Sequence, residues 1–135
     1  MLRQRVPVNP EAAIHGRVAD GVLHLSVRGP ITREVGDQLL AEAMALAAQS
    51  GARRILYDFR LATLIEGVVS LIRRVKQVDQ SELLRTARIA IVCKVRTNDY
   101  AFLETTSIQH GIDFRVFTDG AAALQWMQEP TRYHG

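Results

Sequence analysis

A carboxylate at the end of a predicted strand is the first group in this sequence that could do chemistry. Asp58 follows the apolar run Ile55-Leu56-Tyr57, which predicts a buried strand that stops at the acidic residue. A carboxylate in that place could act as a general base. It could equally accept hydrogen bonds from the backbone N–H groups of the next residues, and we favour this capping role. Because ligands and partners dock at strand ends in open α/β sheets, Asp58 begins the candidate site.

The histidines and the single cysteine are weaker candidates. His15 and His24 lie on two strands that should pair, and together they could begin a metal site, but no third ligand is evident. We therefore favour a solvated or hydrogen-bonded pair and predict no bound metal. His110 and His134 are isolated in the sequence. Cys93 ends a nearly continuous apolar run, so we interpret it as a small buried residue rather than a nucleophile.

The short motifs that signal common catalytic and nucleotide sites are missing. The sequence lacks G-x-G-x-x-G, G-x-x-x-x-G-K, G-x-S-x-G and H-E-x-x-H. Its glycines lie singly, most of them at predicted turns and helix ends, rather than in a loop that could hold a nucleotide. No nucleophile and base can be paired from the sequence, so we predict a protein that is not an enzyme and needs no cofactor.

Composition bounds the class of protein. A chain of 135 residues, 47% hydrophobic and 23% charged, indicates one globular domain with a real core. The net charge is +3, but only 6% of the residues are aromatic, which argues against a dedicated nucleic-acid surface. One cysteine excludes an intrachain disulfide and suits a reducing, cytoplasmic setting. No apolar run is long enough to span a membrane, and the N-terminus does not resemble a secretory signal.

A β-hairpin should open the domain. Residues 13–18 and 22–27 are rich in strand-forming side chains, and Asp20-Gly21 between them is a strong hairpin signal. Alternation along the second strand puts Leu23, Leu25 and Val27 on the core face. Gly29-Pro30 is expected to break this strand.

The two ends of the chain are expected to lie outside the domain. Residues 1–11 are predicted to form a flexible arm, because Pro7 and Pro10 prevent regular strand pairing. The domain itself should cover residues 12–129. Residues 130–135 follow the last helix as a short C-terminal tail.

Two helices should flank the central strand. Thr32 is a plausible N-cap for a helix over 33–49, which Gly51 ends. Its apolar stripe is formed by Val35, Leu39, Ala43, Leu46 and Ala47. A second helical pattern begins at about Leu64, with an apolar face formed by Ile65, Val68, Val69, Ile72 and Val75. The cations Arg73, Arg74 and Lys76 in its last turns would complement the helix dipole.

The remaining pattern alternates strand and helix. The run 87–93 is nearly continuously apolar, which is typical of a strand covered on both faces. Helix caps at 97–99 and 118–119 and a further strand at 112–117 complete the order β-β-α-β-α-β-α-β-α. A hairpin followed by this alternation predicts a single-domain α/β fold with a mixed sheet of about five strands flanked by helices.

Two segments of this sequence resemble the STAS family, named for sulphate transporters and anti-sigma-factor antagonists. The first is YDFRLATLIEGVVSL at 57–71, which is similar to the family's strand, loop and helix N-terminus. The second runs from Phe114 to Asp119 and on to Trp126-Met127. It resembles the F-x-D-x-x-x-A-x-x-W-L ending of a bacterial subgroup that is sometimes classed with lipid-binding CRAL-TRIO-like domains. The resemblance implies a STAS-like fold whose partner binds at that loop and helix N-terminus.

The resemblance fails at the residue that regulates the family. In the family's D-S-S-G-like loop a kinase phosphorylates a serine, whereas this chain has Glu66 before Gly67. Because Glu66 has no hydroxyl, phosphorylation at that position is excluded. A carboxylate on the first turn of the helix could present the fixed negative charge of a permanently modified form. The alternative is an ordinary residue at the start of a helix.

These observations predict a non-catalytic, regulatory binding module of bacterial type. The protein partner, in the resembling family a regulatory kinase or sigma-regulator-like protein, would contact the segment 58–69 through Asp58, Arg60, Thr63, Ile65, Glu66, Gly67 and Val69. The alternative is a carrier or sensor of a small apolar or lipid-like ligand held between sheet and helices. A homodimer is also consistent with an exposed apolar helix face. Trp126, the single tryptophan, is expected to be a core or dimer-contact aromatic.

Overall fold

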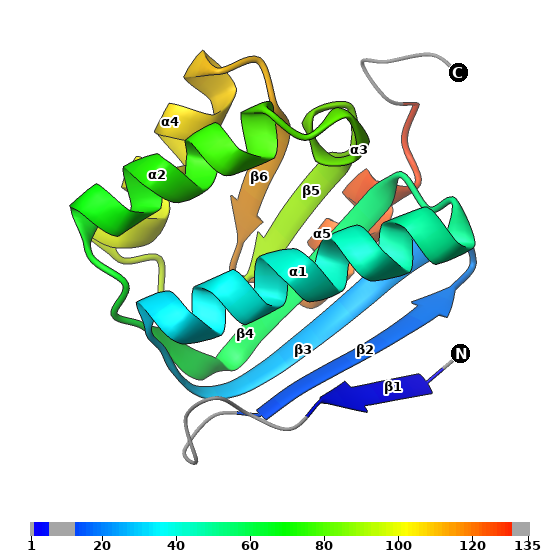
Figure 1. The fold of residues 1–135 in the computed structure, drawn as a ribbon, viewed down its shortest axis with the longest axis horizontal. Coiled ribbons are helices and arrows are strands. Elements are labelled where there is room, and N and C mark those ends of the chain that lie inside the picture. The colour runs from blue at the N-terminus through cyan, green and yellow to red at the C-terminus, as the bar shows by residue number, and fades with distance from the viewer. Residues whose placement is uncertain (1, 6–12, 131–135) are drawn as a thin grey trace.

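A mixed six-stranded sheet is the centre of the fold. The computed structural model of the protein describes residues 2–5 and 13–130. The strands lie in chain order from β1 to β6, the first two pairings being antiparallel and the last three parallel (Figure 1). The strands are β1 (Leu2–Arg5), β2 (Ala13–Ala19), β3 (Val22–Ile31), β4 (Arg54–Leu64), β5 (Arg88–Val92) and β6 (Asp113–Phe117). The helices are α1 (Arg33–Ser50), α2 (Val68–Asp79), α3 (Glu82–Arg85), α4 (Asn98–Gln109) and α5 (Gly120–Met127). The predicted α/β class and mixed sheet are confirmed.

The sheet has one strand more than expected because part of the N-terminal segment is paired. Leu2–Arg5 runs antiparallel to β2, with Leu2 opposite Arg17 and Arg5 opposite Ile14. The prediction of a flexible arm is therefore wrong for these residues. Both prolines of the segment follow the paired stretch, so they do not interrupt it. The rest of the predicted arm and residues 131–135 of the predicted tail lie outside the described residues.

Strand β3 continues through the residues that were expected to break it. The hairpin itself is confirmed, with Asp20 and Gly21 at φ values of 54° and 76° in its turn. β3 then runs on through Gly29 and Pro30 to Ile31, paired with β4 on one side. The described pairing with β2 ends at Arg28, so the missing N–H of Pro30 removes no hydrogen bond there.

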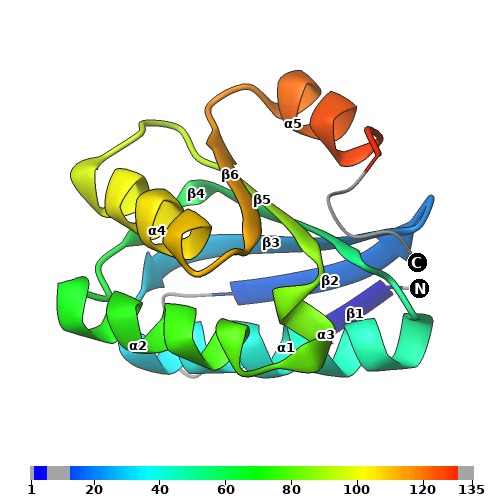
Figure 2. The same ribbon diagram turned by 90° about the horizontal axis from the view of Figure 1, so that it is seen from above.

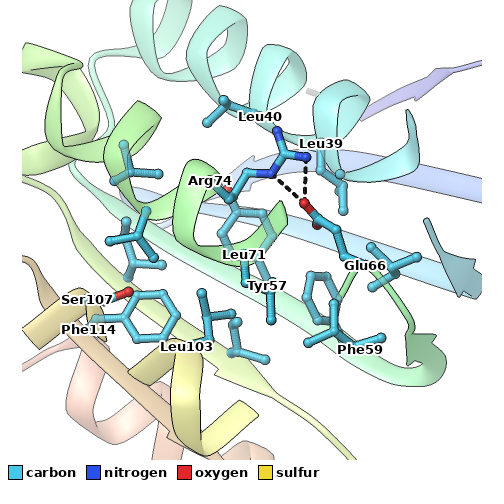
Figure 3. Close-up of a pocket in the computed structure, with 17 residues that line it drawn as sticks. Leu39, Leu40, Tyr57, Phe59, Glu66, Leu71, Arg74, Leu103, Ser107 and Phe114 are labelled. Carbon is cyan, nitrogen blue, oxygen red and sulfur yellow. Dashed lines mark hydrogen bonds and ion pairs between the residues drawn. The ribbon is translucent and has the colours of Figure 1, made fainter. Parts of the chain in front are cut away.

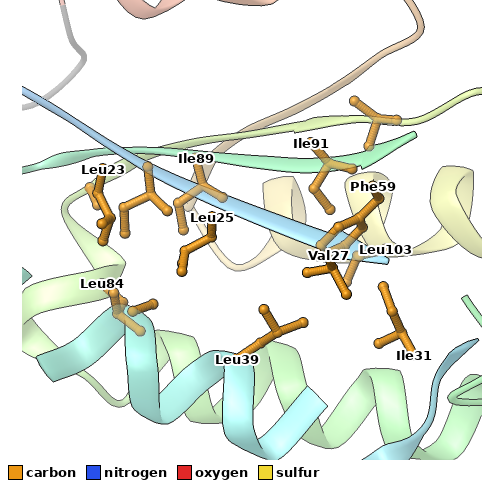
Figure 4. Close-up of a cluster of buried hydrophobic side chains, with 14 of the residues drawn as sticks. Leu23, Leu25, Val27, Ile31, Leu39, Phe59, Leu84, Ile89, Ile91 and Leu103 are labelled. Carbon is orange, nitrogen blue, oxygen red and sulfur yellow. The ribbon is translucent and has the colours of Figure 1, made fainter. Parts of the chain in front are cut away.

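The helices cover the two faces of the sheet unequally. Figure 2 shows α1 and α2 along one face and α5 alone on the other, while α4 packs against β6 and α2. The main core lies between the sheet and the first group of helices and contains Leu23, Leu25, Ile89 and Ile91 (Figure 4). All five residues of the stripe predicted for the first helix are buried in α1. Every residue of β5 is buried, as its apolar run predicted.

A smaller core fixes α5 to the opposite face. Ala123 and Met127 are fully buried there beside Val22 and Leu56, and Trp126 packs against this cluster. The Arg88 guanidinium lies 4.3 Å from the Trp126 ring centroid and donates to the Trp126 carbonyl at 2.8 Å. Trp126 is therefore partly buried against the smaller core, and a dimer contact through it stays a prediction.

Candidate functional site

The strand that enters the segment 58–69 does not end at Asp58. Strand β4 continues to Leu64, because the long β3 offers it a partner after a bulge opposite Ser26–Arg28. Pairing with β5, in contrast, ends at Asp58 and Val92. The helix α2 begins only at Val68, with Gly67 as its N-cap at φ 89°. The prediction that the strand stops at Asp58 and the helix starts near Leu64 is therefore wrong by several residues at both points.

Asp58 binds the arginine two residues after it. Arg60 Nε donates to Asp58 Oδ1 at 2.9 Å and Arg60 Nη2 donates to Asp58 Oδ2 at 2.7 Å. The two side chains thus form a bidentate ion pair. The Arg60 backbone N–H also donates to Oδ1 at 3.1 Å, which is the expected capping interaction. The Arg60 hydrogen bonds hold the pKa of Asp58 below its usual value. A carboxylate engaged in this way is a poor general base.

Glu66 lies in a buried ion pair rather than on the surface. Its side chain is only 3% exposed, and Arg74 Nη2 donates to Glu66 Oε2 at 2.7 Å. The Ser70 hydroxyl donates to the same oxygen, also at 2.7 Å. Glu66 precedes the N-cap of α2, so it is not on the first helical turn. The hypothesis that Glu66 presents a phosphoserine-like charge to a partner is therefore wrong, because that charge is neutralised inside the molecule.

Helix α1 leaves room for this ion pair. A Cβ added to Gly36 would lie 2.5 Å from Glu66 Oε1 and 2.7 Å from Arg74 Nη2. Arg74 also donates to Asp37 on α1, at 2.6 Å, so the pair joins the start of α2 to α1. The predicted cation cluster is thus divided, since Arg74 is 11% exposed and paired whereas Lys76 remains exposed in the last turn.

The exposed side of this region is apolar. Five of the nine exposed large hydrophobic side chains in the described part of the chain lie between residues 61 and 72. We call them the apolar strip: Leu61, Ile65, Val68, Val69 and Ile72. Val69 is 83% exposed. Helix α2 instead turns Leu71 and Val75 inward, so of its predicted apolar face only Val75 is buried.

The predicted site residues therefore separate into two groups. Arg60, Thr63, Ile65, Gly67 and Val69 are exposed and lie along the rim formed by β4 and the start of α2 (Figure 1). Asp58 is partly exposed and tied to Arg60, and the Glu66 side chain is buried.

A cavity of about 80 Å³ lies behind α2, between α1, α4 and the sheet. Leucine, isoleucine, valine and phenylalanine side chains form most of its wall (Figure 3). The Glu66–Arg74 pair borders it, and Tyr57 of β4 and Ser107 of α4 also line it. Burial raises the pKa of the Tyr57 hydroxyl. Helix α2 thus has one face on the cavity and the other in the apolar strip.

The other candidates from the sequence do not converge on a site. The strand register puts His15 opposite Ser26 and His24 opposite Arg17, so the two histidines share a sheet face without directly facing each other. Residues 2–5 and 13–130 contain no group of three or more His, Cys, Asp or Glu that could hold a metal ion. His110 lies 3.1 Å from Asp79, and His134 is outside the described residues. Cys93 is buried, as predicted.

Sequence reasoning missed the residues that surround Glu66. Glu66, Ser70 and Arg74 are spaced by four, which would have placed them on one side of a helix and suggested a local network. Gly36 in the first turn of a helix was a second signal, because glycine within a helical pattern usually has a packing reason. Tyr57 and Ser107 carry no local signal, since only the tertiary fold brings them to one cavity.

Comparison with known proteins identifies the fold. No protein-family model and no curated protein matches the chain. Among solved structures, the chain is similar to an anti-sigma factor antagonist from Mycobacterium paratuberculosis, with a TM-score of 0.60, 16% identity and coverage of 92% of this chain and 100% of that one. It is also similar to an uncharacterized protein of the DUF3478 family with a SpoIIAA-like fold from Shewanella loihica, with a TM-score of 0.55, 17% identity and coverage of 86% and 93%.

These similarities confirm the predicted STAS-like fold. The placement in the CRAL-TRIO-like subgroup stays a prediction. Within the described residues, no helix has the length and hydropathy needed to cross a membrane.

Proposed function

We propose that this protein is a non-catalytic regulatory module that binds a partner protein through the apolar strip. The observation that carries the proposal is the exposure of this strip beside the loop that follows β4. Exposed apolar side chains gathered in one region are typical of protein-binding surfaces. Thr63, Gly67 and Arg60 would form the polar rim that such surfaces usually have.

The fold supports a protein partner rather than a substrate. One structural neighbour is an anti-sigma factor antagonist, a class whose name describes action on another protein. We propose a partner of the same general kind, a regulatory kinase or a sigma-regulator-like protein. Binding would be independent of phosphorylation at position 66, where the side chain is a buried carboxylate.

Two exposed positions test the proposal with a matched control. A photo-crosslinking residue at Val69 would identify the partner, and the purified partner would then be titrated against variants by calorimetry. We expect Ile65→Asp and Val69→Asp to weaken binding about tenfold or more. Leu124→Asp, at a 45% exposed position on α5, should bind as the parent does. Equal affinities for all three variants would show that the apolar strip is not part of the interface.

A second copy of the chain is the other protein that the strip could hold. A symmetric dimer through α2 would bury the same residues. Sedimentation velocity separates the two cases: a dimer that Val69→Asp converts to a monomer would assign the strip to self-association.

A lipid-like ligand between sheet and helices is the second candidate function, and the cavity behind α2 favours it. Its volume of about 80 Å³ is far below the ~300–1,000 Å³ of pockets that hold drug-sized molecules. A lipid chain would therefore require α2 to move away from the sheet. Native mass spectrometry of gently purified protein should then show a co-purifying mass, and its repeated absence would argue against this function.

A further inference from the structure

The sheet face opposite the main core is hollowed where α5 does not cover it. Among the described helices, α5 alone lies on that face, and it packs on β4, β5 and β6 (Figure 2). Beyond it, a groove of about 660 Å³ is lined by residues of β2, β3 and β4. Pockets that bind ligands measure about 300–1,000 Å³, so this groove is large enough to receive part of another molecule.

The strand register brings side chains from all three strands into the groove. His15 of β2 lies opposite Ser26 of β3, which lies opposite Asp58 of β4. After the bulge in the β3–β4 pairing, Arg28 lies opposite Leu61. Because paired residues share a sheet face, these side chains point away from the main core. All of them except Asp58 are exposed and therefore open to contact.

The charges that line the groove are not balanced. Arg28, Arg60 and His15 line it, and Asp58 is the one carboxylate among its described lining residues. Arg60 donates to both oxygens of Asp58. The described lining of the groove thus offers no further anion to Arg28.

The neighbouring part of this face has the same sign. Arg17 of β2 is exposed and lies opposite His24 of β3. Burial and then the Arg17 charge lower the pKa of His24. Neither β2 nor β3 contains an acidic residue. Because opposite charges across strands are stabilising and like charges are not, this face would gain from an anionic group supplied by another molecule.

An acidic protein segment fits the groove better than a nucleic acid does. Sites for single-stranded nucleic acids stack the bases on aromatic side chains, and the described lining of the groove contains no Phe, Tyr or Trp. The groove also meets the apolar strip, because Leu61 belongs to both. A protein on the strip could therefore reach the groove without a break in the contact.

We propose that this groove binds an acidic segment of the partner whose apolar side chains contact the apolar strip. The inference rests on the proposed function, because it names the chemistry of the same partner. A carboxylate of that segment pairs with Arg28, beside His15 and Ser26.

A peptide probe tests the groove without the partner. Amide NMR spectra would be recorded with a soluble peptide of repeating Glu-Glu-Leu units, which we expect to shift the signals of His15, Ser26 and Arg28. Arg28→Glu should weaken peptide binding about threefold or more, and Arg28→Ala should weaken it less. Arg85→Glu is the matched control, because it makes the same charge change at an exposed position of α3, which packs on α1 and α2.

The partner captured at Val69 provides the second measurement. Arg28→Glu should weaken its binding about threefold or more, by an amount that falls as salt is added, whereas Arg85→Glu should not. Weaker binding with Val69→Asp but equal effects of the two charge reversals would reject the acidic segment and leave the proposed function standing. A partner that Arg28→Glu weakens and Val69→Asp does not would reject the proposed function and still support an acidic segment in the groove.

Two results with the probes would overturn the inference. One is a peptide that shifts no signal of the groove or is weakened equally by Arg28→Glu and Arg85→Glu. The other is a thymidine oligonucleotide that binds in place of the peptide and is weakened by Arg28→Glu alone, which would make the occupant a nucleic acid. Each variant's amide spectrum shows whether it is folded.

Discussion

Two ion pairs lie within one short stretch of the chain and differ in almost every physical respect. Asp58 and Arg60 are 31% and 54% exposed, close together in sequence, and pair within one strand. Glu66 and Arg74 are 3% and 11% exposed and link the loop before α2 to the helix itself. Through Asp37 the second pair also reaches α1.

The difference shows which residues of the candidate site a partner can contact and which residues hold the local structure in place. An exposed pair is screened by water and contributes little to stability, so Asp58 and Arg60 remain free to exchange partners. A buried pair contributes little relative to an apolar replacement, but removing one member leaves a charge without compensation. Glu66 therefore positions the start of α2, and the neighbouring exposed residues are the ones that a partner can contact.

Removal of the buried carboxylate should have the largest effect. Glu66→Ala leaves Arg74 nearly buried with Asp37 as its remaining anion, so we expect a loss of about 2–4 kcal/mol in the free energy of unfolding. Urea unfolding measures this loss. Glu66→Gln keeps the size of the side chain and an acceptor and should lose less. A loss under about 0.5 kcal/mol for Glu66→Ala would show that this ion pair contributes no more to stability than an exposed ion pair does.

A side chain at Gly36 should disturb the same pair from the opposite helix. Gly36→Val introduces a Cβ at 2.5 Å from Glu66 Oε1, and relief requires the pair to separate or α1 to shift. We expect a destabilisation of about 1–3 kcal/mol by urea unfolding. The double variant Gly36→Val with Glu66→Ala should lose less than the sum of the two single losses, because the clash with the Glu66 carboxylate is gone and Arg74 is no longer held in place by it. Additive losses would contradict this contact.

The exposed pair should give the smallest effect and one that depends on pH. The pKa of Asp58 is lowered in the folded state from its ordinary 3.8, first by the Arg60 hydrogen bond. Its stabilisation is therefore complete above the ordinary value and is lost as the pH falls through the lower folded-state value. At neutral pH we expect Asp58→Asn to cost at most about 1 kcal/mol. Urea unfolding of both proteins at successively lower pH below 3.8 should show this difference shrink.

Much of the fold could be predicted from local pattern. The hairpin turn, the stripe of α1 and the buried β5 each depend on signals within a few residues, and all three are as expected. The end of β4 could not be predicted in this way. Residues 61–64 are held as a strand by the extension of β3 beside them, which is a contact between distant segments.

The candidate site was predictable in position but not in orientation. The segment 58–69 does lie at an exposed rim, because a strand, loop and helix in sequence fix that much. Whether the Glu66 side chain faces the solvent or the interior depends on Gly36 and Arg74. These residues become its neighbours only when α1 and α2 pack together. A carboxylate before a glycine has the same local pattern whether it is exposed or buried.

The glycine in α1 also has a consequence for how this sequence can change. Because Gly36, Glu66 and Arg74 share one small volume, a substitution at one of them alters what the other two tolerate. Exchange of Glu66 for serine would vacate space over Gly36 and leave Arg74 with less compensation. A related chain with a phosphorylatable residue there would thus need a second exchange at position 74. The order of these exchanges would matter, and the three positions should covary across related chains.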